Sequence, residues 1–140
     1  MDADYVLHLP WRRPPISAND RWPHYAVKAR VEQEIKHAAW ALARKAKIPA
    51  LEAILVELVW YPGNNRRVDG DNSAPTLKYL IDGLVKAGVL PDDNSERVLR
   101  GSCRAVMRRN DPWNKADARL ILAITDASAL APLPHYAPEE

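Results

Sequence analysis

The sequence predicts a mixed α+β domain in which two main helices cover one face of a small, roughly four-stranded sheet. Two segments, near residues 24–47 and 75–87, repeat apolar residues at helical spacing. Shorter segments near residues 5–9, 53–60, 98–108 and 118–125 carry the continuous or alternating apolar patterns of strands. Because these elements interleave within 140 residues, we expect one domain.

The first half of the chain predicts strand, loop, helix and strand in that order. Tyr5–Leu9 forms the short first strand, and residues 10–23 contain too much proline for the interior of an element. The following helix repeats apolar side chains on one face, namely Val27, Val31, Ile35, Ala38, Ala39 and Leu42. The run AILVELVW at 53–60 is nearly all apolar and rich in branched residues, which is typical of a central strand.

The second half predicts a helix and two further strands. Pro75 suits the first turn of a helix, where its missing N–H costs nothing, and Gly88 ends that helix. Residues 98–108 alternate, so that arginines share one face of a strand and small or apolar residues the other. Residues 118–125 form the last strand. We therefore place one domain at residues 1–126 and a Pro-rich acidic tail at residues 127–140.

Composition excludes several classes of protein. No apolar run approaches the length that spans a membrane, and the acidic start of the chain lacks the apolar core of a signal peptide. Cys103 is the only cysteine, so no intramolecular disulfide can form, which suits a reducing compartment. We expect a cytoplasmic protein with no membrane partner.

The charges are segregated although the net charge is only +2. Arginines gather in clusters, and several aspartates gather near residues 69–71 and 92–93. Such a pattern can steer a polyanion such as a nucleic acid. From charge alone, a solvated surface of mixed sign is the simpler interpretation.

Acidic groups flank the second helix on both sides. Asp69, Asp71 and Asn72 precede it, and Asp92 and Asp93 follow it. A helix of this length spans about 20 Å, so the two groups meet only if a connecting loop folds back.

Three kinds of chemistry compete for these acids. Turns and helix caps use Asp and Asn routinely, and this explains part of the set. A calcium loop of the EF-hand kind would need Gly and Glu where, counting from Asp69, Ala74 and Leu80 stand. A magnesium site needs only a few carboxylates, with water and substrate phosphates as the remaining ligands, and stands level with turn chemistry.

Lys78 and Asp82 stand four residues apart on the second helix and share a face. One interpretation is a surface ion pair, worth about 0–1 kcal/mol. The other is a cation directed at a phosphate on the metal.

The whole acidic block resembles the RusA family of Holliday-junction resolvases. The matching pieces are Asp69-Gly70-Asp71-Asn72, Lys78, Asp82-Gly83-Leu84, Ala87-Gly88-Val89 and Asp92-Asp93. Upstream, Pro14-Pro15-x-Ser17-x-Asn19 resembles an early loop of the family. The resemblance covers most of residues 5–126. This chain departs from the family in having five residues between Asn72 and Lys78 instead of two.

The resemblance implies a homodimeric mixed α/β fold and magnesium-dependent cleavage of four-way DNA junctions in recombination and repair. It assigns Asp69, Asp71 and Asp93 as metal-binding catalytic residues, with Mg²⁺ as cofactor and Mn²⁺ as a possible substitute. Lys78 joins them as a catalytic residue that stabilises charge on the phosphate. Such small nucleases are often encoded by phages and prophages, so the expected setting is a bacterial or phage-infected cytoplasm.

Junction DNA would be recognised mainly through its phosphates. The arginines expected to contact it are Arg12, Arg13, Arg21, Arg66, Arg67, Arg100, Arg104 and Arg108. Two alternatives remain open. One is a non-catalytic DNA-binding module with a degenerate metal site, and the other is an interaction protein whose acidic loops are only turns.

Overall fold

The computed structural model describes residues 3–63, 70–106 and 118–130, and its helices and strands confirm the predicted mixed α+β class. In chain order the elements are β1 (Tyr5–His8), α1 (Tyr25–Lys45), β2 (Ile54–Tyr61), the 3-10 turn η1 (Gly70–Ser73), α2 (Ala74–Lys86), β3 (Val98–Ala105), β4 (Arg119–Asp126) and the 3-10 turn η3 (Ser128–Leu130). Each predicted element is present, with ends that differ by a few residues. The turn η1 was not predicted, and the last residues of the predicted strand 98–108 lie outside the described part.

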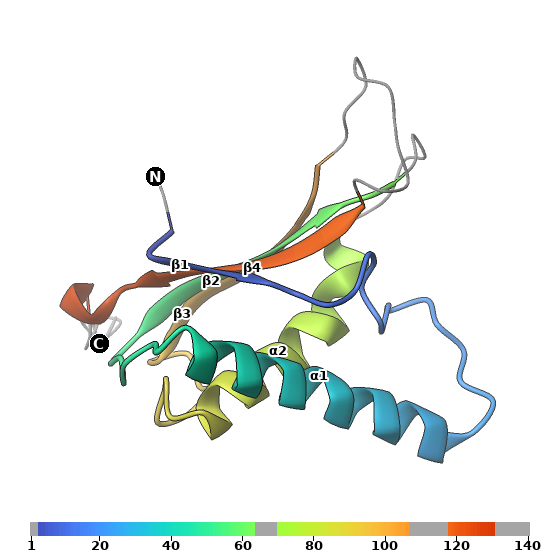
Figure 1. The fold of residues 1–140 in the computed structure, drawn as a ribbon, viewed down its shortest axis with the longest axis horizontal. Helices are drawn as coiled ribbons and strands as arrows, with labels where there is room; N and C mark the ends of the chain where they lie inside the picture. The colour runs from blue at the N-terminus through green and yellow to red at the C-terminus, as the bar shows by residue number, and fades with distance from the viewer. Residues whose placement is uncertain (1–2, 64–69, 107–117, 131–140) are drawn as a thin grey trace, which may run out of the picture.

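The sheet has the order β1-β4-β2-β3 (Figure 1). β4 pairs antiparallel with both β1 and β2, whereas β2 and β3 run parallel. A parallel pair needs a crossover connection, and α2 provides it between β2 and β3. This crossover places η1 after the end of β2 and residues 91–97 before the start of β3.

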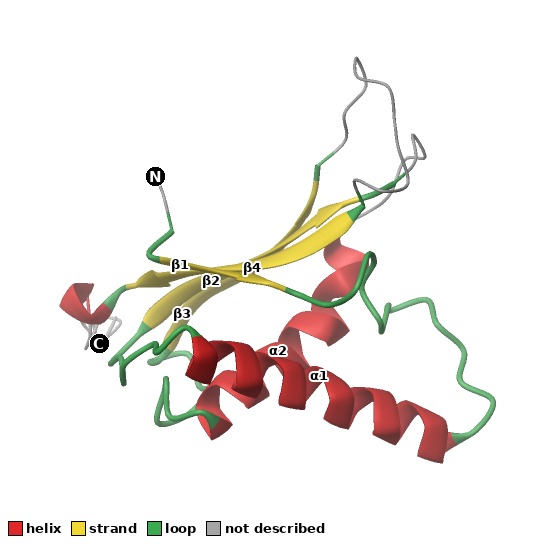
Figure 2. Ribbon diagram, viewed as in Figure 1, coloured by secondary structure: helices red, strands yellow, loops and turns green. Residues whose placement is uncertain are grey.

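Both helices cover the same face of the sheet, as predicted, and within the described ranges no helix covers the other face (Figure 2). Alternate residues of β2 and β4, such as Val56, Leu58 and Leu122, belong to the core beneath the helices. The opposite side chains form what we call the open face. By pairing register it consists of Val6 and His8 on β1, Ile121, Ala123, Thr125 and Arg119 on β4, Leu55, Glu57, Val59 and Tyr61 on β2, and Arg100, Ser102 and Arg104 on β3.

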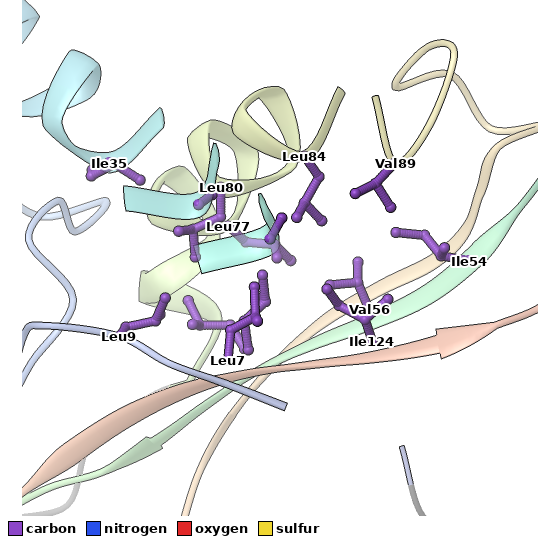
Figure 3. Close-up of a cluster of buried hydrophobic side chains, with 14 of the residues drawn as sticks. Leu7, Leu9, Ile35, Ile54, Val56, Leu77, Leu80, Leu84, Val89 and Ile124 are labelled. Atoms are coloured by element: carbon purple, nitrogen blue, oxygen red, sulfur yellow. The ribbon is translucent and has the colours of Figure 1, made fainter. Parts of the chain in front are cut away.

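The core lies between α2 and the sheet. Leu77, Leu80 and Leu84 face Val56 and Ile124 across this layer (Figure 3). Each of these side chains is at most 7% exposed. Burial of such side chains stabilises the fold by about 1.5–3 kcal/mol each, so the apolar stripe of the second helix accounts for its docking.

The two helices approach each other closely at Gly83. A Cβ atom at this position would lie 2.3 Å from the Lys36 carbonyl oxygen and 2.7 Å from the Ala39 Cβ atom. Only glycine allows that approach. The glycine between Asp82 and Leu84 therefore has a packing role between α1 and α2.

The residues after β4 remain attached to the sheet. The Ala127 N–H donates to the Ala53 carbonyl at 2.9 Å, and the Ser128 hydroxyl accepts from the Glu52 N–H at 3.0 Å. The first residues of the segment assigned to the tail are thus bonded to the domain, while residues 131–140 lie outside the described part. Across the described ranges, neither helix has the length and apolar character needed to cross a membrane.

Candidate functional site

The turn η1 carries Asp71 and lies directly on the C-terminal end of β3. A Cβ atom on Gly70 would lie 3.0 Å from the Ala105 nitrogen, the Arg104 Cα atom and the Cys103 carbonyl oxygen. On the helix-covered face β3 presents only small side chains at Gly101, Cys103 and Ala105, as the alternation predicted. These small residues leave room for the turn, so the position of Asp71 is fixed by the edge of the sheet.

The arginine-bearing loop after β1 is bonded to the same turn. The Ala18 N–H donates to the Asn72 carbonyl at 2.9 Å. Four residues after Asn72, the buried Thr76 hydroxyl accepts from the Ile16 N–H at 3.1 Å and donates to the Ile16 carbonyl at 2.6 Å. These bonds join the Pro14–Asn19 motif to the acidic motif, which lies more than 50 residues away in the sequence.

A second contact fixes the start of this loop. The Trp60 indole N–H donates to the Arg12 carbonyl at 3.2 Å, which ties the loop to the end of β2. The side chains of Arg12, Arg13 and Arg21 are exposed. Exposed guanidinium groups therefore lie on a loop that is anchored beside Asp71.

We expect Thr76→Val to loosen this anchor. The substitution keeps a branched side chain but leaves the buried Ile16 N–H and carbonyl without their partner, at a cost of about 1–3 kcal/mol. The urea midpoint should fall accordingly, and the Ala18 N–H should exchange faster with deuterium. Thr76→Ser, which keeps the hydroxyl, is the control. An unchanged midpoint in Thr76→Val would contradict the anchoring role.

The pKa of the Cys103 thiol depends in part on the negative charge of Asp71. Burial, together with the negative charges of Asp71 and Glu57, raises the pKa of the Cys103 thiol to about 11. The thiol is therefore protonated near neutral pH. This agrees with the interpretation of Cys103 as a small, partly buried core residue and not a nucleophile.

Alkylation of native Cys103 should be slow. At pH 8 a thiol with a pKa of about 11 is ionised to about one part in a thousand, against about one in ten at the ordinary value of 9.0. Because the folded pKa lies above the ordinary one, the thiol's contribution to stability is complete below about pH 9 and is lost as the pH rises towards 11. Iodoacetamide kinetics with and without urea measure the first effect. Equal rates in both conditions would contradict it.

The second acidic group lies beyond the other end of α2. Asp92 is bound within its own turn, since its carboxylate accepts from the Asp93 N–H at 2.7 Å and from the Asn94 amide at 3.3 Å. The backbone hydrogen bond from Asp93 is the main cause that lowers the pKa of Asp92. The pKa of Asp93 is raised, chiefly by its hydrogen bond with the Asp92 side chain and further by the charge of Asp82. Turn chemistry thus accounts for the Asp92 carboxylate, and the Asp93 side chain is hydrogen-bonded to it.

The structure does not bring the two acidic groups together within one chain. Asp71 precedes α2 and Asp93 follows it, and the 13 residues of α2 span about 20 Å. Asp69 lies outside the described residues. In the ranges that the structure describes, no three His, Cys, Asp or Glu side chains are grouped closely enough to hold a metal ion.

Lys78 lies on α2 and is exposed to solvent. Its ammonium nitrogen is 5.5 Å from the ring centroid of Tyr79, and that of Lys36 from α1 is 5.6 Å from the same ring. Burial, followed by a hydrogen bond to Glu32, raises the pKa of Tyr79. The lysine that the resemblance assigns to the phosphate is therefore exposed and lies near the ring of its sequence neighbour Tyr79.

Two of the predicted DNA-binding arginines lie on the open face. Arg100 and Arg104 point the same way from β3, as the alternation predicted, and both are exposed. An Arg104 guanidinium nitrogen lies 3.2 Å from a Glu57 carboxylate oxygen. Arg66, Arg67 and Arg108 lie outside the described residues.

Sequence reasoning missed Glu57 and Thr76. Glu57 is the only charged residue in AILVELVW, and Thr76 falls on the apolar side of α2, where it is fully buried. A polar residue on an apolar stripe was the available signal in both.

Neither a protein-family model nor a curated protein matches the chain.

Proposed function

We propose that this protein is a metal-dependent endodeoxyribonuclease that cleaves four-way DNA junctions, as its resemblance to RusA resolvases implies. The observation that carries the proposal is the hydrogen-bonded union of the arginine loop with the Asp71 turn. A metal-dependent nuclease combines cations that bind the phosphates with carboxylates that bind the metal. The arginine loop and the turn that carries Asp71, two distant segments of the sequence, lie side by side and support this proposal.

Mg²⁺, with Mn²⁺ as a substitute, is the cofactor that suits these donors. Carboxylate oxygens without Cys or His ligands are the set that hard cations prefer. Asp71 and its neighbour Asp69, together with Asp93, would hold the ion. When bound, it would activate a water and stabilise the leaving oxygen. Arg12 and Arg13 would hold the phosphate, and Lys78 would stabilise the negative charge that develops on it.

A second copy of the chain resolves the separation of Asp71 and Asp93. Asp71 lies beside one end of α2, and Asp93 lies beside the other end. A two-fold axis that sets two α2 helices antiparallel would therefore bring Asp71 of one copy towards Asp93 of the other. Such a dimer has two equivalent sites. A four-way junction also has approximate two-fold symmetry and is cut on two strands, so the homodimer fits this substrate in the cytoplasm of a bacterium or a phage-infected cell.

Complementation between inactive variants tests the shared site. Asp71→Asn and Asp93→Asn should each be inactive alone. Mixed after partial unfolding and refolding, they should recover nicking of one strand, because each mixed dimer holds one site with both aspartates intact. Light scattering should give about twice the 15.8 kDa mass of the chain. No recovery in a mixture shown to contain mixed dimers would contradict the arrangement.

The decisive assay compares a synthetic four-way junction with a linear duplex of the same sequence. We expect paired cuts in the junction with Mg²⁺, none with EDTA, and little cleavage of the duplex. Junction binding without cleavage under every metal condition would instead indicate a non-catalytic DNA-binding module. If the protein neither binds nor cleaves the junction, the acidic segments are only turns, and the protein is an interaction protein.

A further inference from the structure

The open face carries an arginine stacked on a tyrosine at one end of the sheet. Tyr61 ends β2, Arg119 begins β4, and the two residues are direct partners in the antiparallel pairing. The Arg119 guanidinium carbon lies 4.3 Å from the ring centroid of Tyr61. Arg119 is exposed and Tyr61 is half-buried, so the guanidinium lies on the solvent side of the tyrosine ring. The result is a flat cationic surface that faces solvent.

The surroundings of this pair favour a polyanion. Val59 is the open-face residue of β2 that comes before Tyr61. It is only 2% exposed, although it lies outside the main core beneath the helices. Arg104 pairs with Val59 across β2 and β3. Arg100 lies on the same strand, four residues before Arg104. Among the open-face residues that pairing register defines, Glu57 is the single carboxylate, and it is bonded to Arg104. The end of the face near Tyr61 is therefore cationic and aromatic.

This pair lies at the same end of the sheet as the acidic turn but on the opposite face. Tyr61 is the last residue of β2, and η1 lies on β3 at Cys103–Ala105, the residues paired with Leu58–Trp60. Asp71 lies on the helix-covered side of that end, and Arg119 on the open side. A DNA strand that passes around the end of the sheet would meet both.

We propose that Arg119, backed by Tyr61, stacks an unpaired DNA base next to the branch point, while Arg104 contacts a phosphate of the same strand. Bases stack on guanidinium planes and on aromatic rings, and such stacking tolerates any base because each has a π face. Fully paired duplex keeps its bases within the helix and cannot use this surface. The inference rests on the proposed function and adds a structural requirement, namely unpaired bases at the branch.

Lysine at position 119 separates stacking from charge. Arg119→Lys keeps the positive charge but removes the planar group. With Ca²⁺ in place of Mg²⁺, the variant should bind a four-way junction and single-stranded oligothymidylate about tenfold more weakly, and linear duplex within twofold of the unaltered protein. Tyr61→Leu should show the same pattern, and Tyr61→Phe should not. Arg44→Lys is the matched control, because Arg44 also lies over an aromatic ring, 5.4 Å from that of Trp40 on α1.

A fluorescent base makes the contact visible. 2-Aminopurine beside the branch should change its emission on binding the unaltered protein, and Arg119→Lys should abolish that change. Equal losses for junction, single strand and duplex, or no loss at all, would overturn the inference while leaving the nuclease proposal intact. A shift from dimer to monomer in Tyr61→Leu would also overturn it, because the face would then be a contact between copies. If the unaltered protein fails to bind branched DNA, the proposed function fails first.

Discussion

Asp71→Asn is expected to reduce junction cleavage by more than about 100-fold, the usual scale for losing one group that stabilises a transition state. The change replaces a carboxylate by a neutral amide of nearly the same shape, so it weakens a site for a hard cation and preserves the turn η1. Binding of the junction should stay the same or tighten, because one negative charge beside the arginine loop is lost.

Single-turnover cleavage and binding in Ca²⁺ measure the two effects separately. Glu34→Gln is the matched control, since it removes another exposed carboxylate, on α1. Cleavage at the unaltered rate in Asp71→Asn would remove Asp71 from the site. A parallel loss of binding would point to a disrupted turn and not to a lost metal ligand.

Gly83→Ala is expected to have the largest effect on stability. Alanine normally stabilises a helix interior by about 1 kcal/mol relative to glycine. Here the new Cβ atom would lie 2.3 Å from the Lys36 carbonyl oxygen, so α1 and α2 must separate. Overpacking of this kind costs about 1–3 kcal/mol or more, and the separation also exposes core leucines.

Urea denaturation of both glycine variants provides the measurement. Gly101→Ala is the control, because its Cβ atom would lie 3.5 Å from the nearest Leu77 atom, an ordinary contact. We expect a lower midpoint in Gly83→Ala and a small change in Gly101→Ala. A stabilised Gly83→Ala would mean that the helices do not cross at this residue.

Local pattern predicted the elements well. The stripe at Leu77, Leu80 and Leu84 and the alternation around Arg100 and Arg104 follow from helix and strand periods, and both are present. The side of β3 that each residue faces was therefore predictable from the sequence, and so was the covering of a single sheet face by two helices.

Long-range pairing was not predictable in the same way. The parallel β2–β3 pair places β3 where η1 lies against Cys103, Arg104 and Ala105, and no local pattern specifies that pairing. The contact of Lys36 on α1 with Tyr79 on α2, and the stacking of Arg119 on Tyr61, depend equally on which elements become neighbours. The acidic residues and their separation by the helix could be found from the sequence, but whether a loop folds back to bring the two groups together required the fold.

The order β1-β4-β2-β3 also has a consequence for synthesis on the ribosome. β4 lies between β1 and β2, yet of the four described strands it is the last to be made (Figure 1). Until residue 126 emerges, β1 lacks its partner strand and one edge of β2 has no hydrogen-bonded neighbour. β2 and β3 can already pair with each other at that stage. Non-local pairing of this kind slows folding and exposes strand edges to aggregation. Nascent chains halted before β4 should therefore be sensitive to protease, and resistance should appear only after the last strand has left the exit tunnel.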